Sequence, residues 1–290
     1  MKKKTKKKNK KIIISIICII LIILAIVLFL IFNKDRGTYT IETMYIKNSD
    51  DQRIFTQVYK PKYKGKMPVV IYSHGLGATY RACSDYAESL VKYNIVSVCM
   101  DFRGGSDRSK SDGRTTDMSF LTEMEDLDTI IEEVKTWKYI DTSNIILMGS
   151  SQGGAISALL SADREDIKGT VLLYPALGIP SVVTKWYSSK EAIPEEVKMT
   201  SKITVGPKYF LDIWDLDVYS IIAKDKKQIL ILQGTEDSLV SPEHSKKVND
   251  IYENSELYFI EGAGHGFEDE QLDEAMVHII DYLKQIETIK

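Results

Sequence analysis

Cysteine is scarce in this sequence: there are three among 290 residues, too few for a disulfide framework. Cys18 lies within an apolar run, and Cys83 and Cys99 could pair only if the fold brought them together. We therefore expect buried free thiols. No group of cysteines and histidines has the spacing of zinc ligands. The sequence thus implies neither a metal nor an organic cofactor.

Acidic residues are missing from residues 1–11, which hold eight lysines, and charge of either sign is missing from residues 12–32. The uncharged run has 21 residues, and about 20 apolar residues cross a bilayer as a helix. A cleaved signal peptide has a shorter apolar region and a small-residue cleavage site, which residues 32–36 do not offer. We expect an uncleaved anchor, a cytoplasmic basic tail and one extracytoplasmic domain at 33–290.

The lysine-rich tail has a second interpretation, as a patch for nucleic acid or anionic lipid. The chain carries a net charge of −3, so without the eight tail lysines the rest carries −11. So acidic a domain is a poor candidate for binding nucleic acid. Beside a membrane span the lysines are expected to set orientation, and we expect no nucleic-acid partner.

The order of sequence patterns indicates an α/β fold. Residues 38–46 and 53–59 alternate in polarity, which predicts an antiparallel hairpin. Six later apolar runs do not alternate, so both faces of these strands should be covered. The runs are residues 68–72, 95–100, 145–148, 170–174, 229–232 and 257–260. Helical patterns separate most of them, at residues 82–93, 120–137, 151–162, 242–252 and 271–286. This alternation predicts a mostly parallel sheet with helices on both faces.

One interval, residues 176–226, is too long to be an ordinary connection between strands. We interpret it as an inserted cap over the carboxyl ends of the strands, the edge at which ligands bind in open α/β sheets. It carries five large aromatic side chains, which would either line a pocket or form the core of the cap. They are Trp186, Tyr187, Tyr209, Phe210 and Trp214.

Ser151 lies in a Gly-Ser-Ser-Gln-Gly run at residues 149–153, between an apolar run and a helical pattern. A G-x-S-x-G motif in a strand–turn–helix setting is typical of a nucleophile elbow, where a sharp turn exposes the serine hydroxyl. The alternative is a glycine-rich turn with a helix-capping serine. We take Ser151 as the candidate nucleophile.

A serine hydroxyl is a weak nucleophile and needs a base. His265 follows the last apolar run and is flanked by glycines that can present its imidazole at the edge of the sheet. The other histidines have different expected roles. His278 should pack or lie at the surface, His244 should be exposed, and His74 should brace its own loop by hydrogen bonds. We expect His265 to be the general base.

The base in turn needs a carboxylate that fixes its tautomer. Asp237 follows the apolar run 229–232, which places it at the same edge as Ser151 and His265. The order Ser, Asp, His is the order that this motif predicts. Glu236 is the nearest rival, and the inserted segment offers Asp212, Asp215 and Asp217.

A tetrahedral intermediate needs backbone N–H donors for its oxyanion. One should come from Gln152, the residue after the nucleophile. The other should come from the loop at residues 73–78, where Leu76 is the expected donor.

Five segments together resemble one superfamily. They are HGLG from His74, DFRG from Asp101, GSSQGG from Gly149, GTEDSLVSP from Gly234 and EGAGHGF from Glu261. Over roughly residues 40–287 the chain resembles α/β-hydrolases, and more narrowly bacterial cinnamoyl or feruloyl esterases and serine aminopeptidase-like relatives. The resemblance implies an eight-stranded sheet with a cap. It also implies ester hydrolysis through an acyl-enzyme, a triad of Ser151, Asp237 and His265, and oxyanion donors at Leu76 and Gln152.

The chain departs from these relatives at two places. Where they commonly read D-x-x-G-H-G-x-S, the run from Asp101 reads DFRGGSDRS without a histidine. That histidine is not a triad member, so the departure concerns the geometry of the loop. In the cap, residues 193–196 and 208–211 lie where phenolic-acid esterases hold ring hydroxyls. Phe210 stands where a phenol-binding tyrosine would be useful, which argues against feruloyl specificity.

The leading hypothesis is a membrane-anchored carboxylic ester hydrolase, acting outside the membrane on small or medium acyl esters. An aminopeptidase, a thioesterase or an acyltransferase would use the same triad. A protein of a different class, a tethered binding protein without turnover, would keep the fold alone. The three triad residue types in the expected order argue against it.

Overall fold

The computed structural model describes residues 38–200 and 203–289. The basic tail predicted at 1–11 and the anchor predicted at 12–32 lie outside these residues. Within the two described ranges, no helix is both long enough and apolar enough to cross a membrane.

Within the described residues, eight strands form one mixed sheet in the order β1-β2-β4-β3-β5-β6-β9-β10. The strands are β1 (Tyr39–Lys47), β2 (Arg53–Pro61), β3 (Met67–Ser73), β4 (Val96–Met100), β5 (Ile140–Ser150), β6 (Gly169–Leu173), β9 (Gln228–Gly234) and β10 (Ser255–Ile260). The neighbours from β4 to β10 pair in parallel, whereas β2 pairs antiparallel with β4. The predicted mostly parallel sheet is confirmed.

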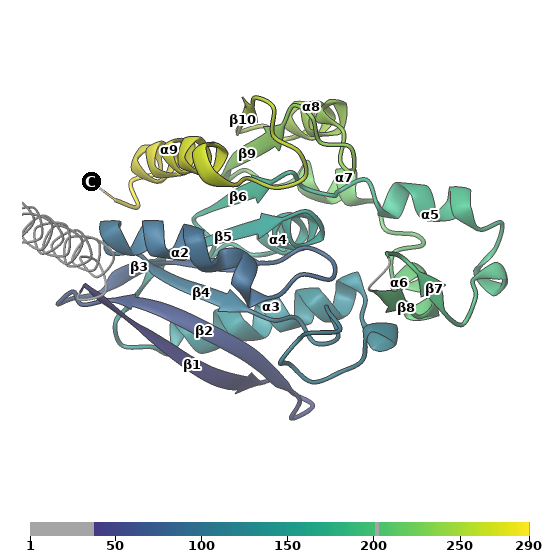
Figure 1. Cartoon of the computed structure of the whole chain (residues 1–290), viewed down its shortest axis with the longest axis horizontal. Coiled ribbons are helices and arrows are strands. Elements are labelled where there is room, and N and C mark those ends of the chain that lie inside the picture. Colours follow the sequence, from purple (N-terminus) through teal and green to yellow (C-terminus); the bar gives the residue numbers. More distant parts are fainter. Residues whose placement is uncertain (1–37, 201–202, 290) are drawn as a thin grey trace, which may run out of the picture. The chain divides into compact units, whose positions relative to one another are not determined.

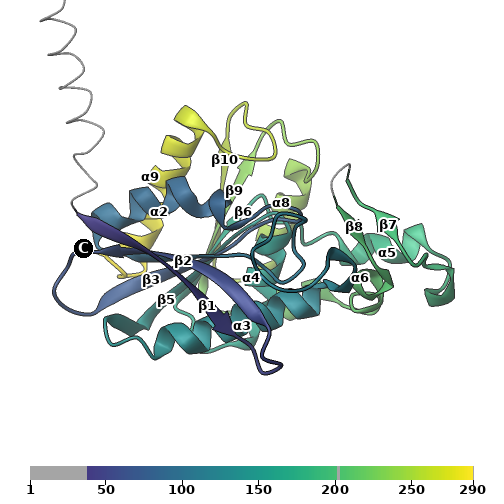
Figure 2. The same cartoon turned by 60° about the horizontal axis from the view of Figure 1, so that its bottom comes forward.

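Helices cover both faces of this sheet, with α2 and α9 on one face and α3, α4 and α8 on the other (Figures 1 and 2). The α-helices of the described chain are α2 (Ser84–Leu90), α3 (Phe120–Lys135), α4 (Gln152–Asp163), α5 (Pro180–Trp186), α6 (Pro207–Leu211), α7 (Val218–Ile222), α8 (Pro242–Ile251) and α9 (Asp269–Gln285). Its 3-10 helices are η1 (Tyr80–Cys83), η2 (Val91–Tyr93), η3 (Thr115–Asp117) and η4 (Lys190–Ala192). Because both faces are covered, every residue of β4 and β6 is buried.

Local sequence explains where two of these helices begin. Ser119 caps α3 in a capping box with Thr122, in which each side chain accepts a hydrogen bond from the other residue's backbone N–H. Pro242 occupies the first turn of α8, where its missing N–H leaves no bond unmade. Two residues further, His244 is half-buried, so the expectation that it is exposed is wrong. Gly178 packs so closely against its ring that a Cβ there would lie 2.9 Å from His244 Cε1.

Residues 176–226, hereafter the cap, contain α5, η4, α6, α7 and a small antiparallel pair, β7 (Val197–Lys198) and β8 (Thr204–Val205). The elements α5, α6, β7 and β8 lie beyond the carboxyl ends of the central strands (Figure 1). Tyr209 and Phe210 are fully buried, whereas Trp186 is 53% exposed. The side chains of Tyr209 and Phe210 therefore pack in the protein interior, and the Tyr209 ring also contacts Phe120 of α3, with centroids 5.9 Å apart.

Cys83 and Cys99 form a disulfide, with their Cα atoms 5.7 Å apart. The expectation of buried free thiols is therefore wrong. The two residues meet because α2 packs against β4 and Cys83, the residue just before α2, lies beside Cys99 near the carboxyl end of that strand. The bond links the start of α2 to the sheet.

Candidate active site

Ser151 occupies the tight turn between β5 and α4. Its backbone has φ of 52° and ψ of −121°, a region that non-glycine residues adopt only when the surroundings enforce it. Two contacts enforce it here. The Ser151 N–H donates to the Leu173 carbonyl at 2.9 Å. Gly153 lies so close to the end of β3 that a Cβ would be 2.2 Å from the Ser73 carbonyl oxygen. The turn projects the Ser151 hydroxyl beyond the end of β5.

His265 lies in the loop after β10 and reaches this hydroxyl. Its Nε2 is 2.9 Å from Ser151 Oγ. The next residue, Gly266, has φ of 153°, a backbone conformation that glycine adopts without steric cost. The Tyr174 ring packs beside the imidazole, with centroids 4.8 Å apart. Tyr174, the residue directly after β6, is a neighbour of the site that the sequence patterns did not single out.

Asp237 holds the other nitrogen of the imidazole. Its Oδ2 lies 2.7 Å from His265 Nδ1, and its side chain is fully buried. Its Oδ1 accepts the backbone N–H groups of Leu239 and Val240 at 2.8 and 2.9 Å. The structure thus brings together the three residues that the sequence proposes as a triad.

The rival carboxylates are elsewhere. Glu236 is exposed. Asp212 accepts from the Ser119 hydroxyl, Asp215 pairs with Lys190 at 2.7 Å, and Asp217 caps α7. None of these carboxylates has a hydrogen bond to His265 in the described part of the chain.

The loop at residues 73–78 lies against the nucleophile. A Cβ on Gly75 would be 3.0 Å from Ser151 Cβ and 3.5 Å from its Oγ, so a side chain at this position would crowd the nucleophile. Among the described residues, the backbone N–H groups of Leu76 and Gln152 have no hydrogen-bond acceptor. Both are therefore free to donate to a ligand at Ser151.

His74 braces this loop, as predicted. Its Nδ1 donates to the Gly75 carbonyl at 2.8 Å, and its Nε2 accepts the Phe102 N–H at 3.1 Å. This pattern requires a neutral imidazole, and burial lowers the pKa of His74 accordingly. Gly77 adds an N–H bond of 2.9 Å to the Gly105 carbonyl. The loop after β4 therefore supports the loop beside Ser151.

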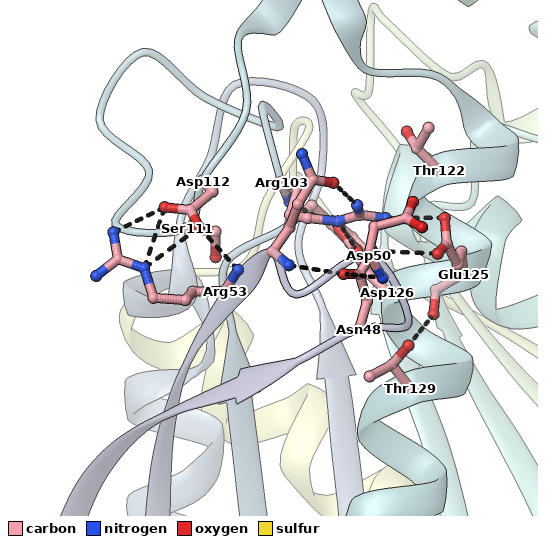
Figure 3. Close-up of polar contacts among 12 residues, drawn as sticks. Asn48, Asp50, Arg53, Arg103, Ser111, Asp112, Thr122, Glu125, Asp126 and Thr129 are labelled. Carbon is pink, nitrogen blue, oxygen red and sulfur yellow. Dashed lines mark hydrogen bonds and ion pairs between the residues drawn. The ribbon is translucent and has the colours of Figure 1, made fainter.

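Arg103 anchors that supporting loop, which lacks the histidine of the resembled family. Its guanidinium pairs with Asp126 and Glu125 of α3, and its side chain is 7% exposed (Figure 3). Asp126 Oδ2 also accepts the Arg103 backbone N–H at 2.8 Å. A buried ion pair thus fixes the start of the loop. Nearer the surface, Arg53 and Asp112 form a separate pair (Figure 3).

The sequence patterns also did not predict a buried row of hydrogen-bonded side chains beside Ser151. The Gln152 side chain donates from Nε2 to Glu123 Oε2 at 2.8 Å and accepts at Oε1 from the Tyr209 hydroxyl at 2.6 Å. The three residues come from α4, α3 and the cap. A glutamate within an apolar helix face was the available signal, because Glu123 lies three positions after Phe120 and four before Leu127, both fully buried.

Comparisons with solved structures agree with the fold. The ferulic-acid-bound structure of Est1E from Butyrivibrio proteoclasticus is 24% identical, with a TM-score of 0.77, and the match covers 84% of this chain and 99% of that one. Acetyl xylan esterase 1 from Thermoanaerobacterium sp. is 19% identical, with a TM-score of 0.63, and the match covers 84% of each chain. These likenesses establish an α/β-hydrolase fold.

A curated relative matches a shorter segment. The quorum-quenching protein AidA of Acinetobacter baumannii is 25% identical over 108 residues, or 37% of this chain. The chain spans about a third of the length of that relative, since the match covers 35% of it.

The family match covers residues 66–212, just over half of the chain, and is to the model described as serine aminopeptidase, S33. The matched segment contains Ser151 with the two expected oxyanion donors and ends before Asp237 and His265. The chain therefore belongs to the serine aminopeptidase S33 family of hydrolases.

Proposed function

We propose that this protein is a serine carboxylic ester hydrolase. The observation that carries the proposal is the hydrogen-bonded chain from Ser151 Oγ to His265 Nε2 and from His265 Nδ1 to Asp237 Oδ2, at 2.9 and 2.7 Å. An acceptor-only carboxylate at Nδ1 favours the tautomer with its proton on Nδ1. The free Nε2 lone pair then faces the serine hydroxyl, as a general base requires.

The reaction follows from these contacts. Ser151 Oγ attacks the ester carbonyl while His265 Nε2 takes its proton, and Asp237 stabilises the resulting imidazolium. The N–H groups of Leu76 and Gln152 bind the oxyanion. Collapse releases the alcohol with the proton from His265 and leaves an acyl-enzyme. Water, activated by His265, then releases the acid and restores Ser151.

Ester substrates have more support than amides. Two of the solved structures that share the fold are named for ferulic acid binding and acetyl xylan esterase activity. The family description instead names an aminopeptidase, so amide cleavage by the same triad is the second candidate. Tyr209 and Phe210 are buried in the cap and offer no exposed phenol-binding group. We therefore propose small or medium acyl esters as substrates.

We also propose that the domain works outside the cytoplasm, tethered by residues 12–32. The uncharged run and the lysines before it support an anchor with a cytoplasmic amino terminus. The Cys83–Cys99 disulfide adds independent support, since such bonds persist mainly in oxidising compartments.

The test is turnover of p-nitrophenyl acetate and butyrate by the full chain in detergent, with labelling by a fluorophosphonate probe. Ser151→Ala should abolish both, whereas the matched control Ser150→Ala should retain both. Labelling that persists in Ser151→Ala would contradict the assigned nucleophile. Faster cleavage of an amino-acid p-nitroanilide than of either ester would favour the aminopeptidase.

A further inference from the structure

The side chain of Gln152 is held at both ends of its amide. Glu123 Oε2 accepts from Nε2 at 2.8 Å, and the Tyr209 hydroxyl donates to Oε1 at 2.6 Å. Gln152 and Tyr209 are fully buried and Glu123 is 1% exposed. Tyr209 bonds the amide oxygen and Glu123 the amide nitrogen, so both ends of the amide have a partner.

This polar chain ends beside the reacting atoms. Gln152 directly follows Ser151 and begins α4, and its backbone N–H is unpaired within the described residues. The same residue therefore presents a free N–H near the nucleophile and a side chain fixed from two sides. A donor that must meet a developing oxyanion works best when its position is set before the reaction begins.

We propose that Glu123 and Tyr209 are positioning residues of this enzyme, which hold Gln152 so that its backbone N–H meets the oxyanion formed at Ser151. The inference rests on the proposed hydrolase function and deepens it. Neither residue touches the reacting atoms in this assignment; both act through Gln152.

The proposal makes the cap part of the oxyanion site. Tyr209 belongs to α6 of the cap and contacts Gln152. Ile203 of the cap lies against the loop that carries Leu76, 3.9 Å from where a Cβ on Gly77 would be. The cap thus contacts the neighbourhood of both expected donors. The position of the cap over the sheet should therefore affect the rate of the chemical step as well as substrate affinity.

The charge state of Glu123 bears on this role. Burial raises the pKa of Glu123 to about 8. The titratable groups around it are Asp126 on the same helix, Tyr209 on α6, and His74, whose ring it approaches across Gly105. None of them is a cation at neutral pH, so none of these charges opposes the effect of burial on the Glu123 carboxyl. Ionised, it would place a negative charge near the oxyanion and oppose its formation.

The first test removes the cap's bond. Tyr209→Phe keeps the ring and deletes the hydroxyl, so kcat for p-nitrophenyl butyrate should fall roughly tenfold with little change in KM. This is less than the loss of 10²–10³ that follows removal of an oxyanion donor itself. The second-order rate of fluorophosphonate labelling should fall in parallel, because that reaction uses the same donors.

The matched control is Phe210→Leu, which disturbs the packing of the same cap helix but leaves the Tyr209 hydroxyl in place. It should lower the melting temperature without a selective loss of kcat. Equal losses of kcat in Tyr209→Phe and Phe210→Leu would reduce the role of Tyr209 to packing and overturn the proposal. A wild-type kcat in Tyr209→Phe would do the same.

The second test uses Glu123. Glu123→Gln mimics the neutral acid and should rescue most of the kcat that Glu123→Leu loses. Wild-type kcat should decline above about pH 8, and in Glu123→Gln this decline should shift upward or vanish. An unchanged alkaline limb in Glu123→Gln, together with full activity in Glu123→Leu, would overturn the proposal.

Failure of the two proposals can be told apart. If wild-type protein shows no turnover that depends on Ser151, the hydrolase function is wrong and the positioning role falls with it. If wild-type turnover depends on Ser151 and the variants at Tyr209 and Glu123 match their controls, the function stands and the positioning role alone is wrong.

Discussion

Asp237 and His265 are 28 residues apart in the chain, and a 2.7 Å contact joins Oδ2 of the first to Nδ1 of the second. They come from the loops after β9 and β10, which are parallel neighbours in the sheet. The carboxyl ends of two adjacent parallel strands therefore bring the acid to the base. Because Asp237 bonds Nδ1, the other ring nitrogen, Nε2, is the one that faces Ser151.

Replacing Asp237 by asparagine should lower kcat by about 10⁴, because an amide can donate to Nδ1 and leave the proton on Nε2, where the serine proton must go. Steady-state kinetics with p-nitrophenyl butyrate measure the loss. The matched control is Glu236→Gln, one residue earlier in the chain and exposed, which should retain wild-type kcat. A loss confined to Glu236→Gln would transfer the acid's role to that residue.

The sequence predicts the arrangement of the triad residues, but it does not predict the disulfide. Ser151, Asp237 and His265 each follow an apolar run, and parallel strands place such positions at one edge. Cys83 lies in a helical pattern and Cys99 in a strand. Their meeting depends on how α2 packs across β4, which neither pattern encodes. The hydrogen bond between Tyr209 and Gln152 joins residues 57 apart. It depends on how the irregular cap packs against α4, which the sequence pattern does not encode.

The double variant Cys83→Ala/Cys99→Ala should lose about 3 kcal/mol of unfolding free energy, the loop-entropy value expected for a loop of this length. The cysteines are 16 residues apart. Urea denaturation measures the loss, and Cys18→Ala, which leaves the bond intact, is the control. Thiol titration of denatured, unreduced protein should find one free thiol among the three cysteines. Three free thiols would refute the bond.

At pH 8, above the value of about 7 to which burial raises the pKa of Asp126, Arg103→Met should destabilise the protein by about 3–5 kcal/mol, since it leaves the buried carboxylate of Asp126 without its partner. Asp126 is fully buried and Arg103 is 7% exposed. Arg53→Met is the matched control, because the Arg53–Asp112 pair is 53% and 32% exposed and such pairs contribute about 0–1 kcal/mol. Chemical denaturation compares the two variants. Similar losses in both would argue against an anchoring role for Arg103.

Stability should decrease as pH rises through the neutral range. Burial raises the pKa of Glu123 from 4.5 to about 8 and that of Asp126 from 3.8 to about 7. Between the lower and the higher value the folded state retains a proton that the unfolded state has released. The contribution of these two carboxyls to the free energy of unfolding therefore falls with pH from about 4 to about 8 and levels off above that range.

The contribution of Glu123 to the pH dependence of stability can be measured with Glu123→Gln, because the glutamine side chain cannot ionise. Scanning calorimetry of this variant between pH 5 and 9 should give a melting temperature that falls less than in the wild type. A remaining slope below about pH 7 is expected from Asp126, whose pKa burial raises to about 7. Glu243→Gln, which alters a carboxyl that is 77% exposed, should follow the wild-type curve. If Glu123→Gln follows it as well, Glu123 is already ionised in the folded protein near pH 7, and the buried carboxyl is stabilised as an anion by its bond to Gln152.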